Sequence, residues 1–209
     1  MRKNAMKLLM TALLMAVAAP FVNAQVQVGD ILCEGDTVVR PADFDTANYQ
    51  AIGVVFHVDD SGKHGWAVSL YNDGSEPWGG YGEDSPLNNV RGKGKAAKDT
   101  DGYANTKSIL EADGADFPAF LLVDFENGWY LPAVGQLKKL YAVFYDVNAT
   151  LMKTGGDLFE KTGFTYWSST ECNPNDAWYL CSIGGISRTS NSFNDCKKSS
   201  RYIRSVRTF

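Results

Sequence analysis

The sequence predicts an α+β domain, and three segments indicate it. Residues 51–58 are rich in β-branched and aromatic residues, and a second apolar alternation follows at 64–71 after a polar turn, which is the pattern of an antiparallel hairpin. Residues 133–144 place apolar side chains three and four positions apart, which is the spacing of an amphipathic helix. From residue 166 onward, β-formers alternate with glycine and serine, so only strands and loops are expected there.

The first 24 residues have the order of a secretory signal peptide. Three basic residues precede the apolar run 8–19, and small residues stand at Val22 and Ala24. We expect cleavage after Ala24, which makes Gln25 the new N-terminus. The apolar run is too short to cross a bilayer, and no later run is long enough. We therefore expect an exported protein, periplasmic, at the cell surface or secreted, with no stable membrane insertion.

Length and charge narrow the class of protein further. Removal of residues 1–24 leaves 185 residues, which suits one domain, and takes the formal net charge from −4 to −7. A chain this acidic lacks the electrostatic footprint of nucleic-acid binding, so no nucleic-acid partner is expected. Basic residues near the C-terminus are interpreted as a solvated strand with salt-bridge partners: Lys197, Lys198, Arg201, Arg204 and Arg207.

The first half of the mature chain divides into an entry segment and the beginning of the main domain. Residues 25–50 form the entry segment, and the main domain covers 51–209. Within the entry segment, residues 26–39 predict two short strands on either side of the turn at 34–36. Residues 72–98 are rich in glycine, proline and charge, so they predict a long loop.

The second half of the chain carries the helices and the last strands. Helices are predicted at 104–113, 133–144 and 146–154. In the second of these, Gln136, Lys138 and Lys139 are expected to face solvent. The remaining expected elements are strands: a short one at 127–131, a hairpin made of 177–183 and 186–188, and a final strand at 202–209.

No arrangement of catalytic or metal-binding residues is recognisable. His57 and His64 lie near one turn, but no further ligands stand at a metal-site spacing, so no metal and no cofactor are expected. No base is in view to activate Ser168 or Thr170, and both are expected to satisfy backbone groups, with Glu171 pairing a terminal arginine. Four cysteines allow three disulfide pairings, and these stay open: Cys33, Cys172, Cys181 and Cys196.

Aromatic and polar motifs run through the chain from about Val54 to Phe209. In their order they resemble the exported bacterial domains related to the C-terminal domain of the Legionella collagen-like adhesin, the Lcl C-terminal domain family. The motifs are Gly65-Trp66-Ala67-Val68-Ser69-Leu70, Asp101-Gly102-Tyr103-Ala104-Asn105-Thr106, Gly128-Trp129-Tyr130-Leu131-Pro132, Gln136-Leu137-Lys138-Lys139-Leu140-Tyr141, Tyr166-Trp167-Ser168-Ser169-Thr170-Glu171, Ala177-Trp178-Tyr179 and Val206-Arg207.

The resemblance implies a fold related to C-type lectins and formylglycine-generating enzymes, with two helices and short twisted antiparallel sheets. Such domains mostly bind ligands or cell surfaces, and no catalytic residue carries over. The calcium-dependent sugar-binding triplets of animal lectins are missing, because the nearest string, Glu76-Pro77-Trp78, lacks the third oxygen ligand. For an enzyme of this fold, Cys181 and Cys196 are only formal candidates for a copper-binding pair.

The segment between Cys172 and Cys196 has an unusual composition. Of its 25 residues, 24 can be encoded by a codon that ends in a pyrimidine, and only Trp178 cannot. Adenine-directed diversification of asparagine codons would leave this signature, and the alternative is a loop rich in serine, asparagine and glycine. Under the diversification hypothesis these residues form the ligand-binding face: Asn173, Asn175, Tyr179, Cys181, Ile183, Arg188, Asn191, Phe193 and Asp195.

Together, these observations predict a secreted or surface-associated, adhesin-like module that binds a glycan or protein ligand and is not an enzyme. Tyrosine and tryptophan supply rigid contact area, while serine and asparagine supply adaptable hydrogen bonds. Two alternatives remain. One is a subunit of a surface fibre, in which residues 26–39 act as an assembly strand that can be removed without unfolding the domain. The other is an enzyme related to the formylglycine-generating fold.

Overall fold

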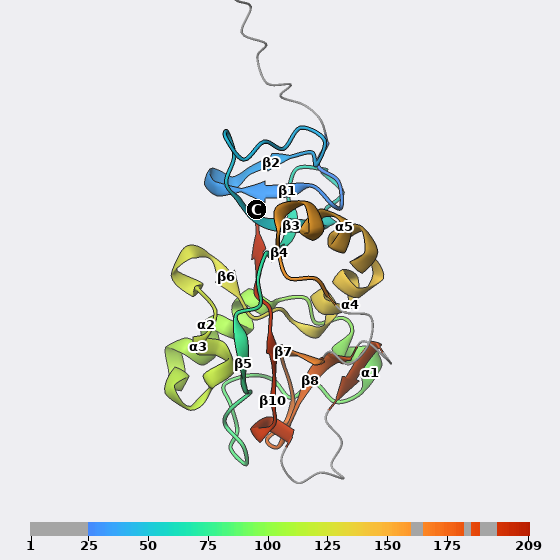
Figure 1. The fold of residues 1–209 in the computed structure, drawn as a ribbon. Coiled ribbons are helices and arrows are strands. Elements are labelled where there is room, and N and C mark those ends of the chain that lie inside the picture. Colours follow the sequence, from blue (N-terminus) through green and yellow to red (C-terminus); the bar gives the residue numbers. More distant parts are fainter. Residues whose placement is uncertain (1–24, 160–164, 182–184, 189–195) are drawn as a thin grey trace, which may run out of the picture.

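The computed structural model describes residues 25–159, 165–181, 185–188 and 196–209, apart from the side chains of residues 113, 185–188 and 196. In these residues the chain forms two β-sheets and five α-helices, which confirms the α+β class (Figure 1). The predicted signal peptide lies outside the described residues. None of the described helices has the length and hydropathy that a bilayer crossing needs.

Sheet A has six strands in the order β2-β1-β3-β4-β11-β6, and all neighbours are antiparallel. The predicted hairpin is confirmed, because β3 and β4 pair across the turn at 59–64. Val68 and Leu70, on the face that the alternation predicted, are buried. The strands are β1 (Ile31–Cys33), β2 (Thr37–Val39), β3 (Ala51–Val58), β4 (Gly65–Ser69), β6 (Trp129–Tyr130) and β11 (Val206–Thr208).

Sheet B has five strands in the order β5-β10-β7-β8-β9, and the β10–β7 pair is parallel. The predicted hairpin near residues 177–188 is confirmed as the antiparallel pair β8–β9. The strands are β5 (Gly74–Pro77), β7 (Thr165–Asn173), β8 (Asp176–Cys181), β9 (Gly185–Arg188) and β10 (Ser200–Ile203). A short 3-10 helix, η4 (Cys196–Lys198), precedes β10.

The three predicted helices are present, and two single-turn helices accompany them. The two helices implied by the family resemblance are therefore too few. Of the additional turns, α1 lies in the stretch 72–98 that was predicted as a loop, and α3 lies between two predicted elements, where no element was predicted. The helices are α1 (Lys93–Ala96), α2 (Gly102–Asp113), α3 (Pro118–Leu121), α4 (Val134–Ala142) and α5 (Phe144–Thr154).

The main hydrophobic core connects the two sheets through α4 and α5. Val54 and Val68 of sheet A, Leu140 of α4, Val147 of α5 and Tyr166 of β7 belong to one buried cluster. A second cluster packs α2 and α3 against sheet B and is centred on three aromatic side chains, namely Trp78, Phe120 and Trp167. The two sheets are thus held together by shared side-chain packing.

The final strand predicted at 202–209 is wrong, because the chain leaves one sheet and enters the other at this point. β10 belongs to sheet B and β11 to sheet A, with Arg204 and Ser205 between them. The side chain of Arg204 is buried, and the Ser205 N–H donates to the Asp73 carboxylate at 2.6 Å. These two anchors interrupt the strand at a position where the sequence alternation continues.

Two further expectations are corrected by distant partners. The long loop predicted at 72–98 contains β5, which pairs with β10 more than 120 residues later, and also α1. Gln136 does not face solvent, because its side chain is 1% exposed. Its Oε1 accepts the N–H groups of Gly102 and Ala133, and its Nε2 donates to the hydroxyl of Tyr130. An amide therefore occupies a buried position in α4 because all of its polar atoms have partners.

The entry segment forms part of sheet A. β1 lies between β2 and β3, and Ile31, Leu32 and Cys33 are all buried. The Gly29 N–H donates to the Val55 carbonyl at 2.8 Å, and the Val55 N–H donates to the Asp30 carbonyl at 2.8 Å. The segment is therefore packed into the domain, and its removal would expose both the edge of β3 and apolar side chains.

We expect Leu32→Ala to lower the free energy of unfolding by about 2–5 kcal/mol, because it leaves a cavity at a fully buried position. Urea denaturation of the mature chain would measure the loss. Val28→Ala is the matched control, because Val28 lies in the same segment and is exposed. The expectation is contradicted if Leu32→Ala lowers the free energy of unfolding no more than Val28→Ala does. That result would favour the fibre alternative, in which the entry segment can be removed from a folded domain.

Candidate ligand-binding surface

A buried ion pair fixes the interior of sheet B. Lys197 Nζ lies 2.5 Å from Glu171 Oε1, and the two side chains are 0% and 1% exposed. Glu171 Oε2 also accepts the Ser85 hydroxyl at 2.8 Å, and the Lys197 ammonium lies over the Trp78 ring. Burial lowers the pKa of Lys197, while hydrogen bonding and charge attraction from Glu171 oppose that shift. The predicted ion pair of Glu171 is confirmed, but the predicted partner is wrong, because it is Lys197 and not a terminal arginine.

The hydroxyls of the Tyr-Trp-Ser-Ser-Thr-Glu motif satisfy neighbouring groups, as predicted. Ser168 Oγ donates to the Trp178 carbonyl at 2.7 Å. Thr170 Oγ1 accepts the Val134 N–H at 3.0 Å and donates to the Asp99 carboxylate at 2.7 Å. These hydrogen bonds join β7 to β8, to the start of α4 and to Asp99, so both hydroxyls hold β7 to the rest of the domain.

Three buried tryptophans complete this interior, which we call the frame: Trp78, Trp167, Glu171, Trp178 and Lys197. Each indole N–H donates to a backbone carbonyl, Trp78 to Ser168, Trp167 to Glu76 and Trp178 to Val90. Because every indole is both buried and hydrogen-bonded, the frame has defined side-chain positions. It can therefore hold surface residues of β8 and β10 in fixed places.

The turn between β7 and β8 contains the first two predicted ligand-binding residues. Asn173 Oδ1 accepts the N–H groups of Asn175 and Asp176, and its Nδ2 donates to the Asp176 carboxylate at 2.9 Å. Asn173 thus fixes the shape of the turn. The side chain of Asn175 is exposed.

Tyr179 and Cys181 lie on the same face of β8, and both are half-buried. The Tyr179 ring meets the Trp167 ring edge-on, with centroids 6.0 Å apart. The Arg201 guanidinium of β10 lies over the Tyr179 ring, 3.9 Å from its centroid. We call these side chains, together with the adjacent turn, the display surface: Asn175, Tyr179, Cys181 and Arg201.

The remaining predicted ligand-binding residues are only partly placed. Arg188 lies in β9 opposite Trp178, and only its backbone is described. Ile183, Asn191, Phe193 and Asp195 lie outside the described residues. Arg201 was missed, since the basic residues near the C-terminus were interpreted together as a solvated strand with salt-bridge partners. The sequence feature that could have indicated Arg201 is its place beside Tyr202 in the same short strand, β10.

The described part of the chain has no group of three His, Cys, Asp or Glu side chains placed to hold a metal ion. Cys33, Cys172 and Cys181 are free thiols, the first two buried, and burial raises the pKa of the Cys33 thiol. The side chain of Cys196 lies outside the described residues, which leaves the formal copper pair without a geometry.

The display surface lies away from both ends of the described domain. The Val26 N–H donates to the Gly62 carbonyl at 3.1 Å, and Phe209 exchanges two backbone hydrogen bonds with Gly65 at 3.2 Å. Residues 26 and 209 therefore meet at the turn between β3 and β4. The Lys197 N–H donates to the Asn175 carbonyl, which places η4 beside the β7–β8 turn. In Figure 1, η4 lies at the opposite end of the molecule from the C-terminus.

No protein-family model and no curated protein matches this chain. Its structure is similar to that of a fimbrial protein from Bacteroides ovatus, with a TM-score of 0.70 and 22% sequence identity. The similarity covers 88% of this chain and 49% of that one, so the chain spans about half the length of the protein it matches. At this level of identity the likeness concerns the fold.

Proposed function

We propose that this protein is a secreted or surface-associated, adhesin-like module that binds a glycan or protein ligand and catalyses no reaction. We also propose that it belongs with the Lcl C-terminal domains and has their C-type-lectin-like fold. The observation that carries the functional proposal is the display surface, where Tyr179 and Arg201 stack above a fully buried frame. Tyrosine and arginine are the residues that most often dominate binding energy at interfaces.

The position of this surface supports the proposal. The described domain begins and ends at the turn between β3 and β4, and the β7–β8 turn lies beside η4 at the other end (Figure 1). A module attached through either end would present the display surface outward. The rigid frame also reduces the conformational entropy that is lost on binding, because the aromatic rings beneath the display surface are already held in place.

A glycan and protein array probed with residues 25–209 would test the proposal. We expect Tyr179→Ala to weaken binding of the strongest array ligand by about tenfold or more, since it removes the ring that carries the guanidinium. Asn175→Ala, at an exposed turn position, is a second variant with little effect on folding. Tyr145→Ala is the control, because Tyr145 is 63% exposed on α5.

Two results would contradict the proposal. One is an array ligand that binds Tyr179→Ala, Asn175→Ala and Arg201→Ala as tightly as it binds the unaltered chain. The other is the absence of any array ligand for a chain that is folded by circular dichroism.

A second candidate is a subunit of a surface fibre, which is supported by the structural similarity to a fimbrial protein. The purified mature chain distinguishes the two. A fibre subunit forms polymers that electron microscopy and size-exclusion chromatography detect. A binding module stays monomeric and retains its ligand affinity.

A further inference from the structure

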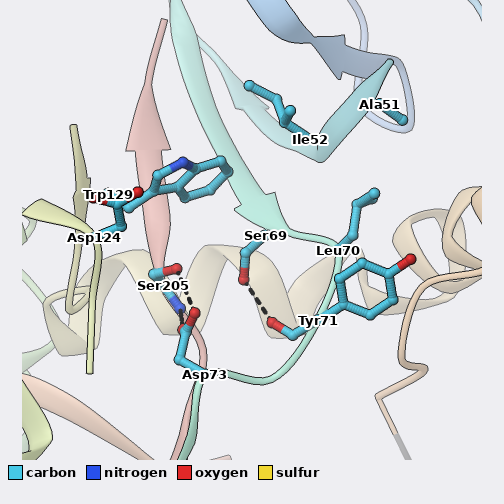
Figure 2. Close-up of a pocket in the computed structure, with 9 residues that line it drawn as sticks. All are labelled: Ala51, Ile52, Ser69, Leu70, Tyr71, Asp73, Asp124, Trp129 and Ser205. Carbon is cyan, nitrogen blue, oxygen red and sulfur yellow. Dashed lines mark hydrogen bonds between the residues drawn. The ribbon is translucent and has the colours of Figure 1, made fainter. Parts of the chain in front are cut away.

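A pocket of about 310 Å³ opens on sheet A, whereas the display surface belongs to sheet B. Residues from β3, β4, β6 and the β10–β11 connection line it. Figure 2 shows Trp129 and Asp124 on one side and Ile52, Leu70 and Tyr71 on the other. This volume is at the lower end of the range found for small-ligand sites.

The polar groups of this pocket offer acceptors. Asp73 accepts the N–H and the hydroxyl of Ser205, at 2.6 and 3.2 Å, and Ser69 Oγ donates to the Tyr71 carbonyl at 2.9 Å. Both hydroxyl hydrogens are therefore used within the protein. Asp124 Oδ2 accepts a hydrogen bond from the Asn127 side chain at 2.8 Å, and Asp124 is exposed at the rim. The carboxylate oxygens of Asp73 and Asp124 can accept further hydrogen bonds, so a ligand that donates hydrogen bonds would fit this pocket.

The charge of the lining is negative. Asp73 and Asp124 supply two carboxylates, and the lining contains no lysine, arginine or histidine. Two arginines lie nearby. The guanidinium of Arg204 donates to the backbone carbonyls of Ser69 and Leu70, and its positive charge also acts on Asp73, whose pKa is nevertheless raised by burial. Arg207 is paired with Asp36 at 2.8 Å. A cationic ligand would compensate the carboxylate charge that these contacts leave.

The walls of the pocket are apolar, and one of them depends on a glycine. A Cβ atom on Gly53 would lie 2.7 Å from the Val68 carbonyl oxygen and 3.1 Å from Trp129 Cη2. Glycine therefore leaves room for the indole beside β3. Opposite it lie the side chains of Ile52 and Leu70 and the ring of Tyr71 (Figure 2). An aliphatic stem fits between these walls.

We propose that this pocket binds a primary alkylammonium group, the chemistry of a lysine side chain or of a free alkylamine. The ammonium supplies three donors and a positive charge to Asp73 and Asp124, while its stem packs against Leu70 and Ile52. The Trp129 ring adds attraction to the cation. A neutral sugar supplies donors as well, but it brings no positive charge to the carboxylates. The site is independent of the display surface and of the ligand proposed there.

Titrating residues 25–209 with N-acetyl-lysine methylamide and with pentylamine, followed by NMR, tests this inference. We expect dissociation constants on the order of 1 mM at low salt, which increase as salt screens the carboxylates. Trp129→Ala should weaken binding about tenfold and Asp124→Asn about threefold or more. Tighter binding of the lysine derivative would identify a polypeptide as the source of the amine, and tighter binding of pentylamine a free amine.

Tyr179→Ala and Tyr145→Ala are the controls and should leave amine binding unchanged, so this test and the array test can fail separately. Asp124 is exposed and its replacement by asparagine keeps the shape, so that variant decides the matter if Trp129→Ala does not fold. The inference is wrong if neither amine binds at concentrations well above 1 mM, or if both variants bind as the unaltered chain does. Binding of a panel of neutral monosaccharides with no binding of amines would also overturn it.

Discussion

Replacing Lys197 with methionine is expected to lower the free energy of unfolding by about 3–5 kcal/mol, because it leaves the Glu171 carboxylate buried without its cation. The loss has little to do with the strength of the ion pair itself. Removing one partner exposes the full cost of an uncompensated charge in the interior. Urea denaturation monitored by tryptophan fluorescence measures the effect directly, since the ammonium lies over the Trp78 ring.

The double variant Lys197→Met/Glu171→Leu is expected to recover most of this loss, since two apolar side chains then replace the charges. Lys198→Met is the matched control. That lysine is the next residue in η4, is exposed and lies over the Tyr81 ring, so its loss should be under about 1 kcal/mol. The explanation fails if the single and double variants are equally destabilised, because the cost would then lie in packing.

Replacing Arg204 with methionine is expected to cost about 3–5 kcal/mol of unfolding free energy. The guanidinium is buried and donates to the backbone carbonyls of Ser69, Leu70 and Asp157, at 2.9, 2.7 and 3.0 Å. The Leu70 carbonyl keeps the Asp157 N–H as a donor at 2.8 Å, but a buried carbonyl that is left without a donor carries a desolvation penalty of about 1–3 kcal/mol. Burial lowers the pKa of Arg204, but arginine still supplies the planar set of donors that these carbonyls require.

Arg204→Lys should recover only part of this stability, since one ammonium cannot reproduce the planar fork. Arg207→Met is the control, because Arg207 and its partner Asp36 are partly exposed and such pairs contribute about 0–1 kcal/mol. Denaturation curves of the three variants decide the matter. An Arg204→Met loss equal to that of Arg207→Met would show that the carbonyls find other donors.

The sequence predicted those elements whose partners lie close along the chain. The β3–β4 hairpin and α4 were correct because alternation and helical spacing record which side chains are buried locally. The frame was partly predictable for the same reason, since Trp167 and Trp178 lie in β-rich segments and are buried. These patterns report on the environment of each residue along its own element.

The features that the sequence did not predict depend on distant partners. Lys197 and Gln136 are polar residues at buried positions. Their burial is made favourable by partners outside their own elements, namely Glu171 for Lys197 and the Gly102 N–H for Gln136. The division of the last strand is a similar case, because Arg204 is anchored by residues more than 130 positions earlier. For the display surface, the sequence indicated Tyr179, but not the cation of Arg201 above it.

The position of the last two strands has a consequence for how the protein folds. β10 lies between β5 and β7, and β11 lies between β4 and β6, so both sheets need residues 200–208 in their interiors. Because the chain is synthesised from its N-terminus, neither sheet can be completed until residues 200–208 are available for pairing. Pairings over such sequence distances also form slowly. The two sheets therefore depend on the same short segment for their completion.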